Sequence, residues 1–124
     1  MPDAISPIHA AFAHAFAQDW IDAWNSHDIE RILSHYDEDV TLASPVALRP
    51  INGGVIRGKA ALRDYFTRGL QAYPDLRFDL IDTFWGIETI VLYYTSSFRS
   101  SNTAEVMLLN SSVHVIRVWA NYDQ

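Results

Sequence analysis

The chain has 124 residues, 49% of them hydrophobic and 19% charged, and its formal net charge is −6. These values are typical of one globular domain spanning residues 1–124 and leave no room for a second domain. An acidic chain without a basic cluster is a poor partner for nucleic acid or for an anionic membrane surface. We therefore expect a neutral or weakly polar small molecule as the ligand.

Cysteine usage and hydropathy exclude further classes of protein. The sequence contains no cysteine, which excludes a disulfide framework and thiolate chemistry. No apolar run is long enough to cross a membrane as a helix. The first twenty residues place no lysine or arginine ahead of an apolar run, so we expect no signal peptide and a cytoplasmic protein.

Helical spacing dominates the first part of the chain. Large apolar residues recur at every fourth position over Ile8–Trp24, which predicts an amphipathic helix with an aromatic stripe. Asp28 can cap a second, short helix whose apolar positions continue to Tyr36. A third, core-facing helix is predicted over Lys59–Tyr73, where Pro74 stops it.

One short strand is expected between the second and third helices. Val40, Leu42 and Ser44 share one face in a period of two, and Pro45 ends the strand because proline cannot donate a ladder hydrogen bond. The acidic stretch over residues 37–39 is interpreted as a solvated connector, because it lacks the glycine and the alternating oxygen ligands of a calcium loop. A loop or small hairpin is expected over residues 49–58.

Past the third helix the pattern alternates as in strands. Four antiparallel strands joined by short turns are predicted at Leu76–Trp85, Ile90–Arg99, Asn102–Leu109 and Val113–Tyr122. The fold class is then α+β, with three N-terminal helices packed on one face of a curved, mostly antiparallel sheet. Because two of the strands carry apolar side chains on both faces, the uncovered face predicts a homodimer formed through the sheet.

Several segments, taken in order, resemble the SnoaL-like branch of the nuclear transport factor 2-like (NTF2-like) superfamily. They are Ala23-Trp24-Asn25-Ser26-His27-Asp28, Asp39-Val40-Thr41-Leu42-Ala43-Ser44-Pro45-Val46, Gly58-Lys59-Ala60-Ala61-Leu62, Tyr73-Pro74-Asp75-Leu76 and Arg117-Val118-Trp119-Ala120-Asn121-Tyr122-Asp123. Ketosteroid isomerases and polyketide cyclases belong to that superfamily. The resemblance implies a cone-shaped, cystatin-like α+β barrel that encloses an apolar cavity, usually in a dimer.

Glu105 is the first candidate for catalysis, because it is a carboxylate inside an otherwise apolar strand. An apolar pocket would raise its pKa and let it act as an acid or a base near neutral pH. The alternative is that Glu105 faces solvent or a dimer partner and pairs with Arg99 or Arg117.

Ketosteroid isomerase uses an aspartate base, a tyrosine donor and a protonated aspartate donor. The resemblance puts Ser44 at the position of the base, Trp20 at that of the tyrosine, and Glu105 at that of the protonated aspartate. Only Glu105 keeps an acid, so the steroid isomerase mechanism is not expected here. Ser44 remains a second catalytic candidate, and its alternative role is to hydrogen-bond the backbone before Pro45.

Aromatic and amide side chains are the candidates for substrate binding. Trp20, Trp24 and Tyr65 could form flat walls of a pocket or be ordinary core. Trp119 and Asn121 alternate onto one face of the last strand, and Asn121 could orient a carbonyl group.

Other polar residues give weaker signals, and neither a metal nor a cofactor is expected. His9 and His14 lack the i, i+4 spacing that ligation from one helix face requires. His35 could form a proton relay with the acids at 37 and 39, although a histidine at a helix C-terminus more often interacts with the helix dipole. Asp79 and Asp82 fall on opposite faces of their strand, so one could point inward and pair with Glu105 to activate water.

Two functions remain open on the sequence. The first is a small-molecule pocket protein, in the form of a cofactor-independent isomerase, cyclase or hydratase that acts on a hydrophobic, carbonyl-bearing substrate. The second is a non-catalytic ligand-binding or dimerisation module of the same fold.

Overall fold

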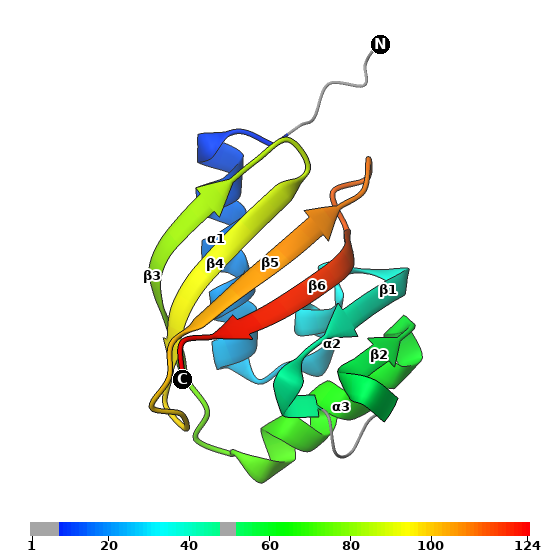
Figure 1. The fold of residues 1–124 in the computed structure, drawn as a ribbon, viewed down its shortest axis with the longest axis vertical. Helices are drawn as coiled ribbons and strands as arrows, with labels where there is room; N and C mark the ends of the chain where they lie inside the picture. The colour runs from blue at the N-terminus through cyan, green and yellow to red at the C-terminus, as the bar shows by residue number, and fades with distance from the viewer. Residues whose placement is uncertain (1–7, 48–51) are drawn as a thin grey trace.

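The computed structural model describes residues 8–47 and 52–124, which form helices on one side of a six-stranded sheet (Figure 1). The helices are α1 (Ala10–Ser26), α2 (Ile29–Leu33) and α3 (Lys59–Ala72), with 3-10 turns at Pro45–Ala47 and Asn52–Gly54. The strands are β1 (Tyr36–Ala43), β2 (Val55–Arg57), β3 (Phe78–Trp85), β4 (Thr89–Ser96), β5 (Thr103–Leu109) and β6 (Val115–Tyr122). The α+β class is confirmed. No helix within the described ranges has the length and apolarity that a membrane crossing requires.

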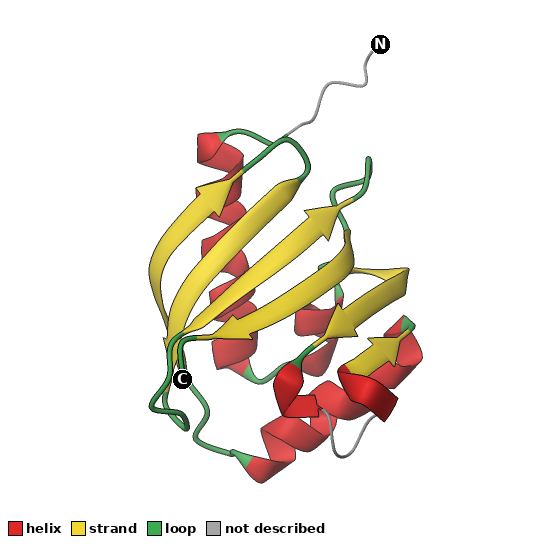
Figure 2. Ribbon diagram, in the orientation of Figure 1, coloured by secondary structure: helices red, strands yellow, loops and turns green. Residues whose placement is uncertain are grey.

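The strands of the sheet follow the order β2-β1-β6-β5-β4-β3. Neighbouring strands are antiparallel except for β1 and β6, which run parallel, so the sheet is mixed. Figure 2 shows the helices in red and the strands in yellow, and α1 lies behind the sheet. Helix α1 packs on β3 and β4, whereas α3 packs on β1 and β2 at the other edge.

Helix α1 forms where the fourfold apolar spacing predicts it, with both ends two residues later than expected. Its stripe of buried residues faces the sheet and consists of Ala13, Phe16, Ala17, Trp20, Ile21, Ala23 and Trp24. The helix ends at His27, which adopts a left-handed conformation (φ 60°) and donates its backbone N–H to the Trp24 carbonyl. Asp28 caps α2 as predicted, because its Oδ1 accepts from the backbone N–H groups of Glu30 (3.0 Å) and Arg31 (3.3 Å).

The segment between α2 and Val40 differs from the prediction. Tyr36, expected on the short helix, is the first residue of β1 and is fully buried. The acidic residues 37–39 also belong to β1 and are not a connector. The pairing of β1 with β6 shifts register between Tyr36 and Thr41, so these residues form an irregular part of the strand. Asp37 is half-buried and accepts a hydrogen bond from Asn110 Nδ2 at 3.2 Å.

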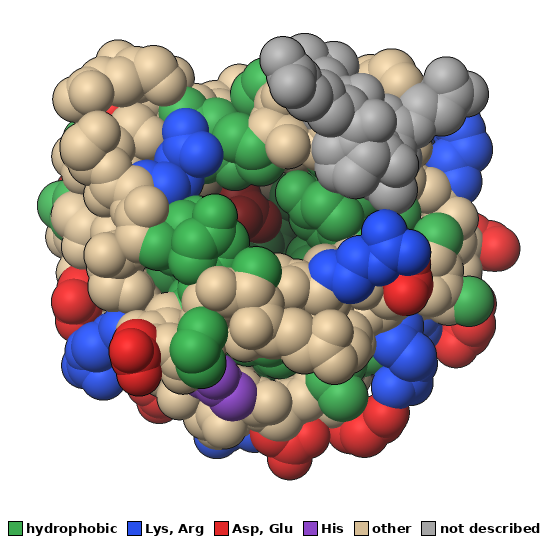
Figure 3. All heavy atoms as spheres, turned by 90° about the horizontal axis from the view of Figure 1, so that it is seen from below, with side chains coloured by type: hydrophobic (Ala, Val, Ile, Leu, Met, Phe, Trp, Pro, Cys, Tyr) green, Lys and Arg blue, Asp and Glu red, His purple; other side chains and the backbone are tan. Residues whose placement is uncertain are grey.

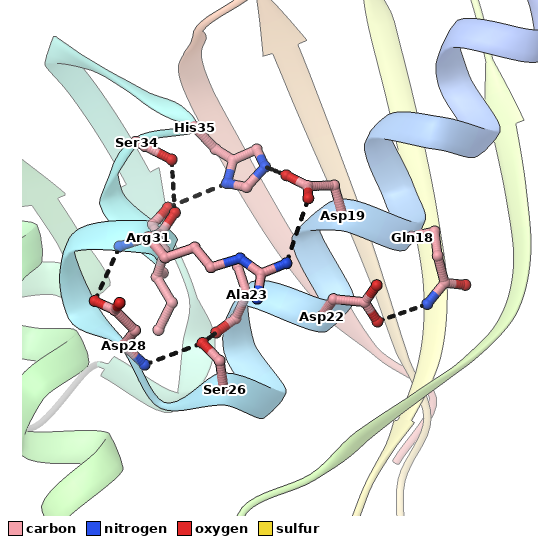
Figure 4. Close-up of polar contacts among 10 residues, drawn as sticks. Gln18, Asp19, Asp22, Ala23, Ser26, Asp28, Arg31, Ser34 and His35 are labelled. Atoms are coloured by element: carbon pink, nitrogen blue, oxygen red, sulfur yellow. Dashed lines mark hydrogen bonds and ion pairs between the residues drawn. The ribbon is translucent and has the colours of Figure 1, made fainter.

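A polar cluster joins α1 to α2 on the surface (Figure 4). The carboxylate of Asp19 lies 2.8 Å from His35 Nε2 and 3.5 Å from Arg31 Nη2. His35 stands just beyond the C-terminal end of α2, with Nδ1 3.4 Å from the Ile32 carbonyl oxygen. The predicted position near the helix end is therefore correct, whereas the described contacts of His35 include no relay to the acids at 37 and 39.

Asn25 holds the end of α1 against the first residue of β3. Its Nδ2 donates to the Phe78 carbonyl (2.9 Å), and its Oδ1 accepts from the Phe78 N–H (2.8 Å). The side chain thus behaves like a paired strand residue at the edge of the sheet. Because Phe78 stacks on Trp20 with 9° between the ring planes, this contact also fixes the aromatic core.

Replacing Asn25 with alanine removes both hydrogen bonds and leaves the Phe78 backbone groups without these partners. We expect Asn25→Ala to lower the free energy of unfolding by about 1–3 kcal/mol, measured by urea denaturation. Gln18→Ala, which removes only an exposed contact to Asp22 on the same helix, is the control and should change stability by less than about 0.5 kcal/mol. Equal effects of the two variants would contradict the role given to Asn25.

Candidate functional site

A cavity of about 500 Å³ lies between the helices and the concave face of the sheet. Its walls are mostly aromatic and come from α1, α3, β3 and β4. The polar groups that face it come from several elements, and they include Ser44 just after β1, Tyr94 and Ser96 of β4, Arg99 of the β4–β5 connection, Glu105 of β5 and Tyr122 of β6. Figure 3 views the molecule from the lower end of Figure 1 and shows the hollow between apolar side chains, with an acidic group at its base. The volume falls within the range of sites for small molecules.

Glu105 is an acid of this cavity, and no other acid is among the described residues that line it. Alternate residues of β5 face inward, and Glu105 is one of them, with 9% of its surface exposed. Leu92 and Ala120 are its cross-strand partners and are also buried. The carboxylate therefore points into the cavity, away from both Arg117 and the outer face.

Tyr94 on β4 donates a hydrogen bond of 2.5 Å to Glu105 Oε1. The other oxygen, Oε2, takes part in no hydrogen bond among the described residues. Burial raises the pKa of Glu105 to about 7, and the bond from Tyr94 opposes part of that increase. Burial and the nearby Glu105 together raise the pKa of Tyr94 well above its usual value, so this hydroxyl stays protonated and acts as a donor.

The cavity brings Ser44, Trp20, Trp24 and Tyr65 together with Glu105, as the sequence predicts. Ser44 is buried at the end of β1, where its Oγ lies 3.5 Å from the Tyr122 hydroxyl. The same Oγ accepts from the Val46 backbone N–H at 3.3 Å. The alternative role predicted for Ser44 is a hydrogen bond to the backbone before Pro45, whereas the observed bond is to the residue just after Pro45. Ser44 thus shapes this turn and also lines the site.

Trp20 and Trp24 form one wall of the cavity. The indole of Trp20 donates to the Tyr36 hydroxyl at 2.9 Å and is 1% exposed. Trp24 packs edge-on against Phe66 of α3, with 4.7 Å between the ring centroids. Trp20 and Trp24 belong to the hydrophobic core and also form a wall of the cavity, because the cavity lies directly beside the core.

Trp119 and Asn121 do not reach the cavity, which corrects their expected placement. They do share a face of β6, but it is the outer face, where Trp119 is 39% exposed. The pairing of β5 with β6 shifts register between Leu108 and Leu109, and the inward set changes from Val115 to Val118 and Ala120. A strict period of two counted from the turn therefore gives the wrong face.

A register shift in another strand also overturns the hypothesis that a second carboxylate points inward beside Glu105. A register shift between Leu80 and Asp82 in the pairing of β3 with β4 leaves both Asp79 and Asp82 exposed. Neither can pair with Glu105 to activate water. No group of three or more histidine, aspartate or glutamate side chains in the described ranges is arranged as a metal site.

Several polar residues that line the cavity are not site candidates in the sequence analysis, among them Tyr94, Ser96 and Tyr122, and Arg99 enters it only as an alternative ion-pair partner of Glu105. A signal existed for Tyr94, because Leu92 and Tyr94 lie on one face by alternation. Alternation alone does not show that Tyr94 lies beside Glu105. That conclusion also requires the register between β4 and β5, which depends on the turn between the two strands.

Comparison with known proteins places the chain among relatives of the same architecture. Residues 17–121 match the SnoaL-like domain. The chain belongs to the SnoaL-like family. A SnoaL-like protein of unknown function from Burkholderia thailandensis shares 33% identity, with 96% of this chain and 100% of that chain covered and a TM-score of 0.90. No curated protein matches the sequence.

More distant solved structures show the same fold. A protein of unknown function with a cystatin-like fold from Methylobium petroleophilum has a TM-score of 0.76 at 13% identity, covering 94% of this chain and 79% of that chain. SalBIII, an epoxide hydrolase/cyclase-like enzyme of pyran ring formation in the polyether salinomycin, has a TM-score of 0.73 at 14% identity, with 92% of each chain covered. The predicted membership of the SnoaL-like family is confirmed.

The raised pKa of Glu105 predicts a pH dependence of stability. Between pH 4.5 and about 7 the folded protein keeps the Glu105 proton that the unfolded chain has released. The stabilisation that the folded state gains by keeping this proton is complete at acidic pH and is lost as the pH rises to 7. The loss destabilises the parent by roughly 3 kcal/mol relative to Glu105→Gln. Urea unfolding of both proteins at pH 4.5, 6 and 8 measures the difference, with the exposed Glu88→Gln as control. A constant difference between parent and Glu105→Gln would contradict the buried position.

Proposed function

We propose that this protein is a cofactor-independent acid–base enzyme of the isomerase, cyclase or hydratase type, with a small, hydrophobic, carbonyl-bearing substrate. The observation that carries the proposal is Glu105, an inward carboxyl group in an apolar cavity with a pKa of about 7. A general acid or base works best when its pKa lies near the working pH. Both the protonated and the ionised form of Glu105 are then available in neutral solution.

The free oxygen of Glu105 is suited to proton transfer. In the ionised form, Oε2 can take a proton from the carbon next to a carbonyl group and return it at another position, which is an isomerisation. In the protonated form, the carboxyl group can give its proton to a carbonyl oxygen while a nucleophile adds, as in cyclisation or hydration. Tyr94 holds Oε1 and so fixes the direction in which Oε2 points.

Hydroxyl groups on the neighbouring strands can orient the substrate. Ser44 and Tyr122 stand side by side at the ends of β1 and β6 and both line the cavity. Burial raises the pKa of the Tyr122 hydroxyl, which keeps it a neutral donor for a carbonyl oxygen. Trp20, Trp24 and Tyr65 supply the apolar walls.

The fold of the relatives is compatible with this proposal. SalBIII is named as an epoxide hydrolase/cyclase-like enzyme, so chains of this shape include one named for ring chemistry. At 14% identity this comparison concerns the fold alone, and the proposal rests on the Glu105 site.

The test begins with the Glu105 carboxyl signal in carbon-13 NMR, assigned with Glu105→Gln, while hydrophobic ketones and lactones are added. We expect a titration near pH 7 that shifts on binding. For a ligand that is turned over, Glu105→Gln should keep the fold and reduce kcat by about 100-fold or more. Tyr94→Phe removes the bond that lowers the Glu105 pKa, so the pH profile of kcat should move to higher pH.

An ordinary Glu105 titration that no ligand moves would contradict the enzymatic proposal. It would favour the alternative, a non-catalytic ligand-binding or dimerisation module. Retention of full turnover by Glu105→Gln would also reject Glu105 as the acid or base, even if a ligand were bound.

We also propose that two copies associate through the outer face of the sheet. Phe84, Val91, Val106 and Trp119 are successive cross-strand partners and form an apolar row across four strands. Phe84 is 53% exposed, and no described helix covers this side of the sheet. A second copy would bury the row.

Sedimentation at micromolar concentration should therefore show a dimer for the parent. Val106→Lys places a charge in the middle of the row and should give a monomer with the same helix and strand content. Gln71→Lys, an exposed change on α3, should leave the dimer intact. A monomeric parent would contradict the proposed association.

A further inference from the structure

Arg99 stands at the rim of the cavity, in the connection between β4 and β5, and is half-buried. Figure 1 shows this connection at the lower end of the sheet, and Figure 3, viewed from that end, shows basic side chains near the opening. The guanidinium lies 4.4 Å from the centre of the Tyr122 ring, and Nε donates to Ser101 Oγ at 3.0 Å. These two contacts hold the group in one orientation.

The guanidinium of Arg99 carries a positive charge that no acid among the described residues pairs with. Arg68 is the other basic residue among the described residues of the lining, and it is exposed and paired with Asp64 at 2.9 Å. In Arg99 the two terminal nitrogens make no hydrogen bond within the described ranges. A fixed guanidinium with both terminal nitrogens free matches the two oxygens of a carboxylate.

Ser96 gives a second and independent sign of a missing polar partner. It is 8% exposed and lines the same cavity, and its Oγ is buried without a hydrogen-bond partner among the described residues. A buried hydroxyl without a partner is costly, so such groups usually have one. Ser96 and Arg99 belong to one turn, because the Arg99 N–H donates to the Ser96 carbonyl at 3.3 Å.

Resting on the function proposed for Glu105, we propose that the substrate is an amphipathic carboxylate whose anionic end binds to Arg99 and Ser96 and whose apolar body extends along the aromatic walls toward Glu105. The ligand class expected from the net charge of the whole chain was neutral or weakly polar. The local charge is different, because the described residues of the lining include two arginines and a single acid. The carbonyl group near Glu105 and the carboxylate at the rim are then two distinct parts of one molecule.

The test uses pairs of compounds that differ only in charge. The ω-phenylalkanoates from phenylacetate to 6-phenylhexanoate are compared with their primary amides by calorimetric titration at pH 6, where the alkanoates are ionised. We expect the best-fitting alkanoate to bind about 10-fold or more tightly than its amide, as for hydrogen bonds to a charged group. Acetate, which has the charge but no apolar body, should not bind in the same concentration range.

Variants then assign the preference to individual side chains. Arg99→Gln should reduce the affinity for the alkanoate to that for the amide and leave amide binding unchanged. Arg99→Lys keeps the charge and the contact to the Tyr122 ring and should retain part of the preference. Ser96→Ala should weaken alkanoate binding several-fold. Arg77→Gln, which removes an exposed arginine outside the cavity, is the matched control and should bind as the parent does.

Three results would overturn the inference. The first is equal affinity of acid and amide for the parent, and the second is a charge preference that survives in Arg99→Gln while circular dichroism shows an intact fold. The third is failure of every alkanoate to bind. None of these results decides the role of Glu105, which the carboxyl titration and the turnover of Glu105→Gln test separately.

Discussion

The hydrogen bond from Tyr94 to Glu105 is the interaction on which the rest of the site depends. A carboxylate enclosed by apolar walls would be strongly destabilised in its charged form, and one short bond at 2.5 Å offsets part of that penalty. The partner is itself buried and remains protonated, so the bond is a donor contact and adds no charge. Burial and this single donor together hold the pKa of Glu105 near neutral pH.

The aromatic stripe of α1 belongs to both the core and the cavity. Trp20 packs on Phe78 and Tyr94, and Tyr94 in turn holds the carboxyl group of Glu105. A change in the packing of this helix therefore moves the donor of the site as well as its wall. The unfilled volume beside these rings lacks packing partners, which is the energetic cost of keeping room for a ligand.

Local patterns in the sequence are sufficient for much of this architecture. The spacing of the apolar residues predicts α1 and α3, the carboxylate of Asp28 predicts the start of α2, and alternation puts Ser44 on one face with Val40 and Leu42. The sequence leaves the face of Glu105 open, and the structure shows it to be the inner one. The errors lie where a strand changes face. The register shifts near Leu80 and Leu108 arise in the pairing of each strand with the next one along the chain, so the periodicity of a single strand does not reveal them. Trp119, Asn121 and the acids of β3 are misplaced for this reason. Arg99 is predicted as the last residue of a strand, but it lies in the connection after β4, where alternation does not apply.

The parallel pairing of β1 with β6 has a consequence for how the protein folds. Strand β6 follows every other strand along the chain, yet it lies inside the sheet and joins the β1–β2 edge to the remaining strands. Until β6 has left the ribosome, β1 has only β2 as a neighbour, and β5 presents an unpaired edge. Contacts that span so much of the sequence slow folding and favour a late, cooperative closure. The cavity, whose polar rim includes residues of both β6 and the β4–β5 connection, is therefore completed only when synthesis of the domain is nearly finished.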